Sequence, residues 1–375
     1  MSLPFERLRR APDIEGEGLV AADAADRLIL DESAAVRAAM GAGEIVVIGD
    51  GYGALALGAA FDGARDVRVH QDSLPGERAI AANAQALGLG DRVSSGPLDA
   101  ALVSGARVVL LRLPRALDAL RDIAGLIAAH AASDVVVVSG GRLKHMTVAM
   151  NDLLRTVFDT LDVTHARQKS RVLIARGPHD GRDPVPAVAR VEGLEVRAFG
   201  GAFAGARLDV GTRALLAALD AAPTAPSGGT VEDPWIDLAC GTGIVGAWLA
   251  RRHPQVHVYA CDQSAVAVAS ARATAAANGL TDRMAVARAD GLEERADASA
   301  SFIALNPPFH SGAALTAEIA ERLFADAGRV LRPGGELWCV WNSPLAYRPA
   351  LQRLVGPTRQ VARDPKFTVT VSTKR

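Results

Sequence analysis

The sequence predicts an α/β protein built from two tandem copies of one unit, each with a mainly parallel sheet. Two observations support this prediction. Short apolar runs alternate with helix-like stretches of small residues, a pattern typical of parallel strands joined by crossover helices. The same order of segments then recurs further along the chain, and recurrence at a fixed spacing indicates a duplicated unit.

The repeat is clearest at one turn and one strand end. In each copy an apolar run ends in a Gly-x-Gly turn, closed by Gly53 in the first copy and Gly243 in the second. The next strand-like run ends in Asp72 or Asp262, and both pairs stand 190 residues apart. A stretch rich in turn formers, residues 177–186, separates the copies. We therefore expect two Rossmann-like domains, over residues 1–177 and 195–375, with a linker over residues 178–194.

The composition is that of a globular protein without a strongly basic surface. Of the 375 residues 49% are hydrophobic, and 41 Lys and Arg balance 42 Asp and Glu. This balance excludes a basic coat for nucleic acid but not a local basic patch. Three cysteines are too few for a disulfide scaffold and fit a reducing compartment, so we expect a cytoplasmic location. Because they form no C-x-x-C pair, we also expect no metal. No apolar run approaches the ~18 residues that span a bilayer, so we expect no membrane partner.

The second copy carries the residues expected to bind a nucleotide-like ligand. Asp237, Gly241 and Gly243 follow a strand and open a helix, where glycines let a ligand approach the backbone beside a helix N-terminus. Asp262 ends the next strand, and a carboxylate there can accept hydrogen bonds from ribose hydroxyls. Gly246 stands one place late for the third glycine of the dinucleotide fingerprint, which argues against NAD.

The segment Asn306-Pro-Pro-Phe309 follows a further apolar strand and suggests the chemistry. Two prolines fix the backbone there, and the Asn306 side-chain oxygen and the Pro307 carbonyl become neighbouring acceptors. Two acceptors can hold both hydrogens of a planar amine, and Phe309 can stack on a base for ~1–3 kcal/mol. The alternative is a turn that only ends the strand, with Phe309 in the core. The segment stands downstream of Asp237 and Asp262, and this order favours a binding site for a planar amine over a simple turn.

These residues resemble the class I S-adenosylmethionine methyltransferases that modify planar amino nitrogens. Within that class the chain is most similar to the RsmC/RlmG type of ribosomal RNA guanine-N2 methyltransferase, and its first half is closer to the RlmG branch. The segments that carry the resemblance are residues 208–213, 306–310 and 331–336, with 108–115 and 165–171 in the first half. The resemblance implies tandem class I methyltransferase domains, of which the first is degenerate.

The resemblance also implies a role for each matched residue. The backbone loop contacts the methionine part of S-adenosylmethionine, Asp262 takes the ribose hydroxyls, and Asp290, ending the third strand, meets the adenine amine. Asp209 and Thr212 close the cofactor pocket. The implied cofactor set is Asp237, Ala239, Gly241, Gly243, Asp262, Asp290, Gly291, Asp209 and Thr212. The implied catalytic segment that holds and stacks the target base is Asn306, Pro307, Pro308 and Phe309.

We therefore expect methyl transfer to a guanine N2 in ribosomal RNA, of the large subunit. The partner is ribosomal RNA, naked or in a pre-ribosomal particle, and the protein is expected to be a monomer. Adenine N6 in RNA or DNA and protein glutamine remain alternative acceptors, because the motif does not determine which nitrogen is methylated. A non-catalytic cofactor-binding module is the other alternative.

The first copy departs from this pattern at its functional positions. Val47 stands where the second copy has Asp237, and Arg112-Leu-Pro-Arg115 replaces the Asn-Pro-Pro-Phe segment. We expect the first domain to be a scaffold or an RNA-positioning surface. For His145 a phosphate contact and a solvated loop position are both open, and we favour the loop.

Overall fold

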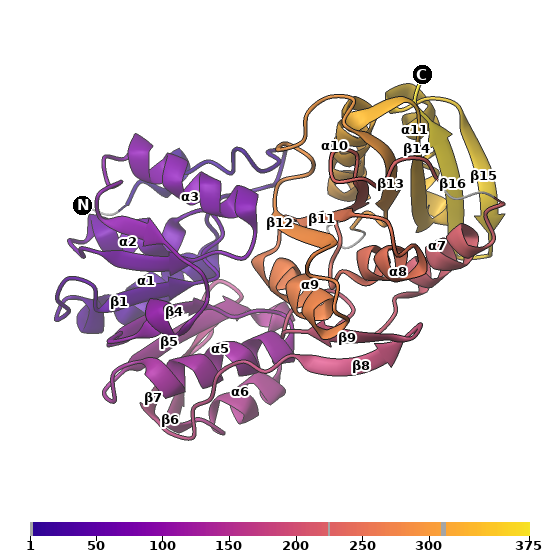
Figure 1. Ribbon diagram of the computed structural model, residues 1–375. Helices are drawn as coiled ribbons and strands as arrows, with labels where there is room; N and C mark the ends of the chain where they lie inside the picture. The colour runs from indigo at the N-terminus through magenta and orange to yellow at the C-terminus, as the bar shows by residue number, and fades with distance from the viewer. Residues whose placement is uncertain (1–2, 224–225, 309–312) are drawn as a thin grey trace. The chain divides into compact units, whose positions relative to one another are not determined.

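The structure is a computed structural model that describes residues 3–223, 226–308 and 313–375 (Figure 1). The chain forms two compact units. Unit 1 comprises Met1–Val185 with Phe199–Gly201, and unit 2 comprises Pro186–Ala198 with Ala202–Arg375. The chain therefore passes from unit 1 to unit 2 after Val185, and only Phe199–Gly201 return to unit 1.

Unit 1 is a seven-stranded sheet with the strand order β3-β2-β1-β4-β5-β7-β6. The first five strands in this order are parallel neighbours, and β7 runs antiparallel to both β5 and β6. Its strands are β1 (Ile45–Ile48), β2 (Val67–His70), β3 (Val93–Ser95), β4 (Val108–Arg112), β5 (Val136–Arg142), β6 (Phe158–Val163) and β7 (Ser170–Pro178). Its helices are η1 (Phe5–Arg7), α1 (Ala24–Arg37), α2 (Ala54–Phe61), α3 (Leu74–Ala86), α4 (Ala100–Val103), α5 (Leu117–His130), η2 (Leu143–His145) and α6 (Val148–Leu154).

Unit 2 repeats this topology, in the order β12-β11-β10-β13-β14-β16-β15, and adds a hairpin of β8 and β9. Its strands are β8 (Ala187–Val191), β9 (Leu194–Ala198), β10 (Trp235–Leu238), β11 (Val258–Asp262), β12 (Met284–Arg288), β13 (Ala300–Leu305), β14 (Leu331–Asn342), β15 (Thr358–Arg363) and β16 (Phe367–Thr373). Its helices are α7 (Val210–Asp220), α8 (Ile244–Arg252), α9 (Ala265–Ala277), α10 (Ala313–Val330), η3 (Ser343–Leu345) and α11 (Arg348–Leu354). The predicted tandem α/β fold is confirmed.

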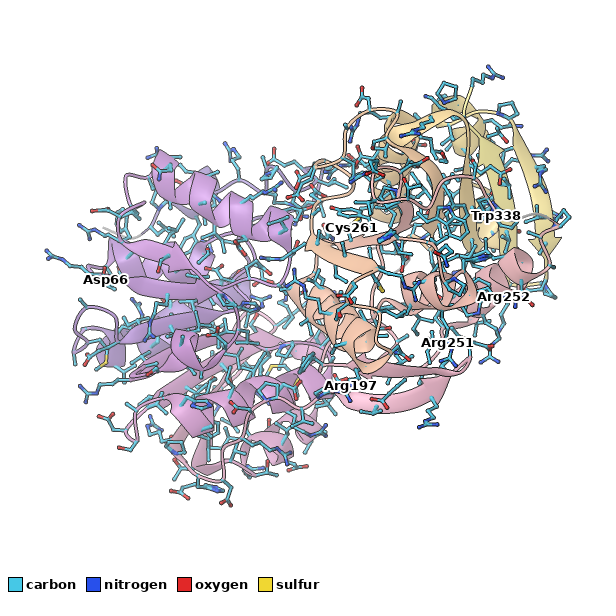
Figure 2. All side chains as sticks on the ribbon, viewed as in Figure 1. Asp66, Arg197, Arg251, Arg252, Cys261 and Trp338 are labelled. Atoms are coloured by element: carbon cyan, nitrogen blue, oxygen red, sulfur yellow. The ribbon has the colours of Figure 1, made fainter. Side chains whose placement is uncertain are left out.

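The central strands are apolar runs because helices cover both faces of each sheet. All four residues of β10 are buried, and its apolar residues point to two core clusters, with Trp235 in one and Ile236 and Leu238 in the other. Trp338 on β14, labelled in Figure 2, packs in the same cluster as Trp235. Asp237 is the one polar residue of β10, and its burial marks the position as special.

The strand registers show which positions of the two units correspond. In unit 1 Ile48 pairs with Leu111, and in unit 2 Leu238 pairs with Leu305. The residue that follows is Arg112 in unit 1 and Asn306 in unit 2. These two residues therefore occupy the same place, at the carboxyl end of the strand beside the central one. In open α/β sheets this edge is where ligands bind.

Candidate active site

The glycine loop of unit 2 joins β10 to α8 and is open toward solvent at one residue. Ala239, Gly241 and Gly243 have left-handed backbone conformations, with φ of 56°, 55° and 75°. A Cβ on Gly243 would lie 2.9 Å from the Ala271 Cβ, whereas a Cβ on Gly241 would meet nothing within 4 Å. Gly243 is therefore required for close packing on α9. Gly241 instead leaves its backbone free for a ligand to approach.

Asp237 lies beneath this loop and holds the start of α8. Its Oδ2 accepts a hydrogen bond from the backbone N–H of Gly246 at 2.7 Å, and the residue is 3% exposed. Burial, together with the negative charge of Asp262, raises the pKa of the Asp237 carboxyl to about 7. A cation placed near Asp237 would favour the ionised form and would be attracted by it.

Asp262 connects the loop to the end of β11. Its Oδ2 accepts the Gly241 N–H at 3.0 Å, and its Oδ1 accepts the Ser264 N–H at 2.9 Å. Each carboxylate oxygen can accept further hydrogen bonds. The carboxylate is thus held in one orientation beside the open face of Gly241, where ribose hydroxyls could reach it.

Asp290 and Gly291 lie just beyond β12. Asp290 is expected to end the third strand, whereas β12 ends at Arg288, so Asp290 stands in the following loop. Asp290 Oδ2 forms an ion pair with Arg322 Nη2 of α10 at 2.8 Å. Gly291 has φ of 64°, and a Cβ on it would collide with the Asp326 carboxylate. The need for glycine at position 291 therefore has a packing reason that does not require a ligand.

Asn306 has a side-chain amide whose two ends are in different situations. Its Nδ2 donates to Asp209 Oδ2 at 3.2 Å and to Thr212 Oγ1 at 3.0 Å. Its Oδ1 is buried and has no hydrogen-bond partner within the described part of the chain. A buried acceptor without a donor is unfavourable by ~1–3 kcal/mol, so this oxygen is a candidate acceptor for a ligand N–H.

Asp209 and Thr212 come from the first turn of α7. Asp209 caps this helix, because its Oδ2 accepts the N–H of Gly211 at 3.0 Å and of Thr212 at 3.2 Å. The resemblance implies that both residues close the cofactor pocket, and the structure shows that both contact the Asn306 amide. The spacing of an N-cap Asp and a Thr three residues later is visible in the sequence, but their partner 94 residues away is not.

The rest of the predicted catalytic segment is only partly visible. Pro307 is buried and Pro308 is exposed. Phe309, the predicted stacking residue, lies outside the described residues. The structure brings Asp209 and Thr212 to Asn306, and Asp262 to the glycine loop, at the carboxyl edge of the unit 2 sheet.

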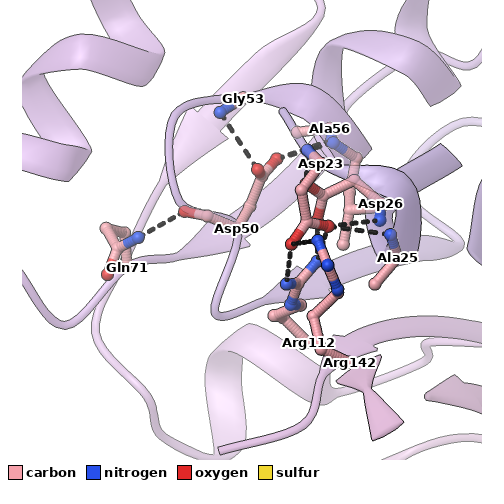
Figure 3. Close-up of polar contacts among 10 residues, drawn as sticks. Asp23, Ala25, Asp26, Asp50, Gly53, Ala56, Gln71, Arg112 and Arg142 are labelled. Carbon is pink, nitrogen blue, oxygen red and sulfur yellow. Dashed lines mark hydrogen bonds and ion pairs between the residues drawn. The ribbon is translucent and has the colours of Figure 1, made fainter. Parts of the chain in front are cut away.

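Unit 1 has a counterpart of the Asn306 cluster at equivalent positions (Figure 3). Asp23 caps α1 as Asp209 caps α7, and Asp26 stands three residues after the cap. Arg112, in the place of Asn306, donates from Nη2 to Asp23 at 2.7 Å and from Nη1 to Asp26 at 2.6 Å. The guanidinium is bound by two carboxylates, so this position of unit 1 presents an ion pair where unit 2 presents an open acceptor.

In unit 1, the protein's own side chains form hydrogen bonds with the glycine loop and the helix after it. Asp50 in this loop is fully buried, and its Oδ2 accepts the N–H of Ala56, which corresponds to Gly246 of unit 2. Burial raises the pKa of Asp50 to about 6. Gln71 Nε2 donates to the Asp50 carbonyl, as Figure 3 shows. Asp50 thus caps α2 from the loop, whereas Asp237 binds the first turn of α8 from the strand.

Other site types receive no support in the described part of the chain. No group of three or more His, Cys, Asp or Glu side chains there could hold a metal ion. Among the same residues no helix is long and apolar enough to cross a membrane.

Comparisons with known proteins agree with this division of the chain. A family profile described as Methyltransferase small domain matches residues 193–371, and one described as RLMG N-terminal domain matches residues 3–179. A protein of Magnetococcus marinus named Ribosomal RNA large subunit methyltransferase G is 32% identical over 98% of this chain and 96% of its own length. A protein of the same name from Streptomyces avermitilis is 33% identical over 98% of this chain and 97% of its own length.

A solved structure shares the fold over almost the whole chain. It is the T. thermophilus 16S rRNA N2 G1207 methyltransferase (RsmC) in complex with AdoMet and guanosine. The TM-score is 0.73 at 21% identity, and the match covers 94% of this chain and 92% of that chain. At this identity the match supports the tandem fold.

Proposed function

This chain belongs to the family of ribosomal RNA large subunit methyltransferase G, and from that premise we propose that it methylates a guanine N2 in large-subunit ribosomal RNA, using S-adenosylmethionine. The observation that carries the proposal is the unpartnered oxygen of Asn306. We further propose that residues 195–375 form the catalytic domain, that residues 1–177 position the RNA, and that the protein acts as a cytoplasmic monomer.

The orientation of the Asn306 amide determines which kind of ligand group can bind beside it. Asp209 accepts a hydrogen bond from Nδ2, and a carboxylate cannot donate one in return. If the amide were flipped, its oxygen would face the Asp209 carboxylate, so Oδ1 points away from Asp209. Asn306 therefore offers an acceptor, which binds an amine N–H and repels a carbonyl oxygen. On the edge of guanine this criterion picks N2 over O6.

The chemistry is dominated by positioning. Asn306 Oδ1 accepts one hydrogen of the amine, and the Pro307 carbonyl is the proposed acceptor for the other. With both hydrogens held, the nitrogen lone pair has one direction in which to react. When bound, S-adenosylmethionine supplies a methyl group on a cationic sulfur. The nitrogen becomes acidic once methylated and releases its proton to water, so no strong base is required.

The remaining residues suit the cofactor. Asp262 is the proposed acceptor of the ribose hydroxyls, and the open space beside the Gly241 Cα would allow the close approach that this needs. Asp290, fixed by Arg322, is the proposed partner of the adenine amine. Asp237 lies under the loop, and its carboxylate complements the positive charge of the methionine moiety.

The test is transfer of labelled methyl groups to unmodified large- and small-subunit ribosomal RNA, followed by nucleoside analysis. We expect label in N2-methylguanosine of the large-subunit RNA. Label in N6-methyladenosine, or in small-subunit RNA only, would contradict the proposed acceptor. Cofactor binding without label in either RNA would indicate a protein acceptor such as glutamine, or a non-catalytic role.

A further inference from the structure

A basic hollow lies at the carboxyl edge of the unit 1 sheet, where β4 and β5 end. These strands are parallel neighbours, with Arg112 opposite Gly140, so the residues after both strands meet at this edge. The hollow has a volume of about 280 Å³, near the lower end of the ~300–1,000 Å³ usual for small-molecule sites. Its charged lining consists of Arg112, Arg115, Arg142, Lys144, His145 and Asp23.

The hollow carries positive charge that the protein does not neutralise. Arg112 is paired with two carboxylates, and Arg142 Nη1 lies 3.8 Å from Asp23. Arg142 Nε is buried without a hydrogen-bond partner in the described part of the chain. Arg115 and Lys144 are exposed, and no ion pair joins either to an acidic residue in that part. The chain as a whole has a net charge of −1, so this excess is local.

His145 lies among the basic side chains of the hollow. Its Nε2 lies 3.5 Å from Arg115 Nη2. Desolvation and the positive charges of Arg115 and Lys144 lower the pKa of the His145 imidazole. Arg115 and Lys144 therefore border the hollow without an acidic partner in the described part of the chain, an arrangement that suits a bound anion.

The turn after the corresponding strand of unit 2 carries no such charge. Ser139 pairs with Leu111 in unit 1 and Cys339 pairs with Leu305 in unit 2, so positions 142–145 correspond to positions 342–345. A single 3-10 turn, η2 or η3, follows the strand in both units. Unit 1 has Arg142, Leu143, Lys144 and His145 there, whereas unit 2 has Asn342, Ser343, Pro344 and Leu345. The cations are therefore a feature of unit 1 and not of the shared fold.

We propose that this hollow binds a backbone phosphate of the RNA substrate, through Arg115 and Lys144 with Arg142 beside them. The inference rests on the proposed function, which supplies a polyanionic substrate. A guanidinium fork and an ammonium group both suit phosphate oxygens. Phosphate contacts fix the register of a nucleic acid without reading its sequence. Under this proposal the carboxyl edge of the sheet binds the target base in unit 2 and the RNA backbone in unit 1.

The experiment measures equilibrium binding of the full-length protein to unmodified large-subunit ribosomal RNA over a range of KCl concentrations. The slope of log Kobs against log [KCl] reports the number of phosphates neutralised. We expect Arg115→Ala and Lys144→Ala each to make the slope shallower by roughly 0.7–0.9, and the double variant by about twice as much. Thermal unfolding followed by circular dichroism checks that each variant is folded.

The matched control is Arg65→Ala, which also removes one exposed positive charge from unit 1. The Arg65 carbonyl accepts the Gly43 N–H, and both residues precede strands, so Arg65 lies at the opposite, amino edge of the sheet. This control is expected to keep the wild-type slope. A double variant with the same slope as Arg65→Ala would overturn the phosphate site.

Methyl transfer by the wild-type protein to the same RNA separates the two proposals. If the wild type binds and methylates the RNA while the double variant keeps its slope, the phosphate site is wrong and the proposed function stands. If the slope changes as expected but no RNA is methylated, the hollow is a phosphate site and the proposed function is wrong. If the wild type does not bind the RNA, both are wrong.

Discussion

The same place in the two units is used in opposite ways. At the end of β13 in unit 2, the Asn306 amide nitrogen donates hydrogen bonds to Asp209 and Thr212, and its oxygen has no partner in the described part of the chain. At the end of β4 in unit 1, Arg112 takes that place, and two carboxylates of the first turn of α1 surround it. In both units the helix N-cap supplies one partner, and the residue three positions later supplies the other.

This contrast shows how a duplicated domain can lose one activity without losing its fold. A guanidinium has only donors, so it cannot hold an amine, and its charge requires acids around it. Although burial acts to raise it, the Arg112 guanidinium lowers the pKa of Asp23 to about 2. The resulting ion pair ties α1 to β4. In unit 2 the Asn306 oxygen has no hydrogen-bond partner in the described part of the chain, whereas in unit 1 the Arg112 guanidinium is paired with Asp23 and Asp26.

The largest effect is expected from removing the open acceptor. Asn306→Ala should lower kcat for methyl transfer by roughly 10³-fold, because the amine loses the group that orients it. The dissociation constant for S-adenosylmethionine, measured by calorimetry, should stay within about threefold of wild type. A large loss of cofactor affinity would instead place Asn306 in the cofactor site.

The counterpart substitution in unit 1 should act on stability. Arg112→Ala removes the guanidinium that pairs with two carboxylates, and Asp26, which is 8% exposed, loses its ion-pair partner. Breaking such a pair is expected to lower the free energy of unfolding of unit 1 by ~3 kcal/mol. All four tryptophans lie in unit 2, so their fluorescence follows unit 2 alone in urea, and far-ultraviolet circular dichroism follows both units. We expect a dichroism transition at lower urea than the fluorescence transition, and coincident transitions would contradict the prediction.

Asp209→Asn tests whether the Asn306 orientation is enforced by charge. Asparagine caps helices about as well as aspartate, so α7 should be retained. Its amide can donate to a flipped Asn306, which then presents the wrong end to the amine. We expect kcat to fall by roughly 10²-fold with little change in the cofactor dissociation constant. Thr212→Ser keeps the hydroxyl acceptor and serves as the control with near wild-type kcat, whereas equal losses in both variants would indicate a general disturbance of α7.

A smaller effect concerns the two buried aspartates at equivalent helix starts. Burial raises the pKa of Asp237 to about 7 and of Asp50 to about 6, and both are near 4 when unfolded. The folded state therefore binds more protons between these values, and the stability of each unit should fall as pH rises from about 4 to the folded pKa. The expected change is on the order of 3 kcal/mol for unit 2, through Asp237, and on the order of 2 kcal/mol for unit 1, through Asp50.

Asparagine variants separate the two contributions to this pH dependence. Asp237→Asn should flatten the pH dependence of the fluorescence-detected urea midpoint, which reports unit 2. Asp50→Asn should leave that midpoint unaffected and flatten only the remaining dichroism signal. Stability of the wild type that rises between pH 4 and pH 7 would show that the sign is wrong.

The sequence by itself was sufficient for the duplicated α/β fold and for the part of the site that local pattern specifies. Strand and helix periodicity, the glycines of the loop and the acids at strand ends depend on neighbours in the chain, so they can be recognised one segment at a time. The position of Asp262 beside Gly241 followed from this, because parallel strands end at one edge.

Only the tertiary structure revealed what holds Asn306 and what replaced it. Asp209 lies 97 residues before Asn306, and Asp23 lies 89 residues before Arg112. Such pairs form because helices α7 and α1 pack with their N-termini against a strand end, and no local pattern encodes that meeting. The basic hollow of unit 1 is of the same kind, since Arg115 and Lys144 follow different strands and share a site only because those strands are parallel neighbours.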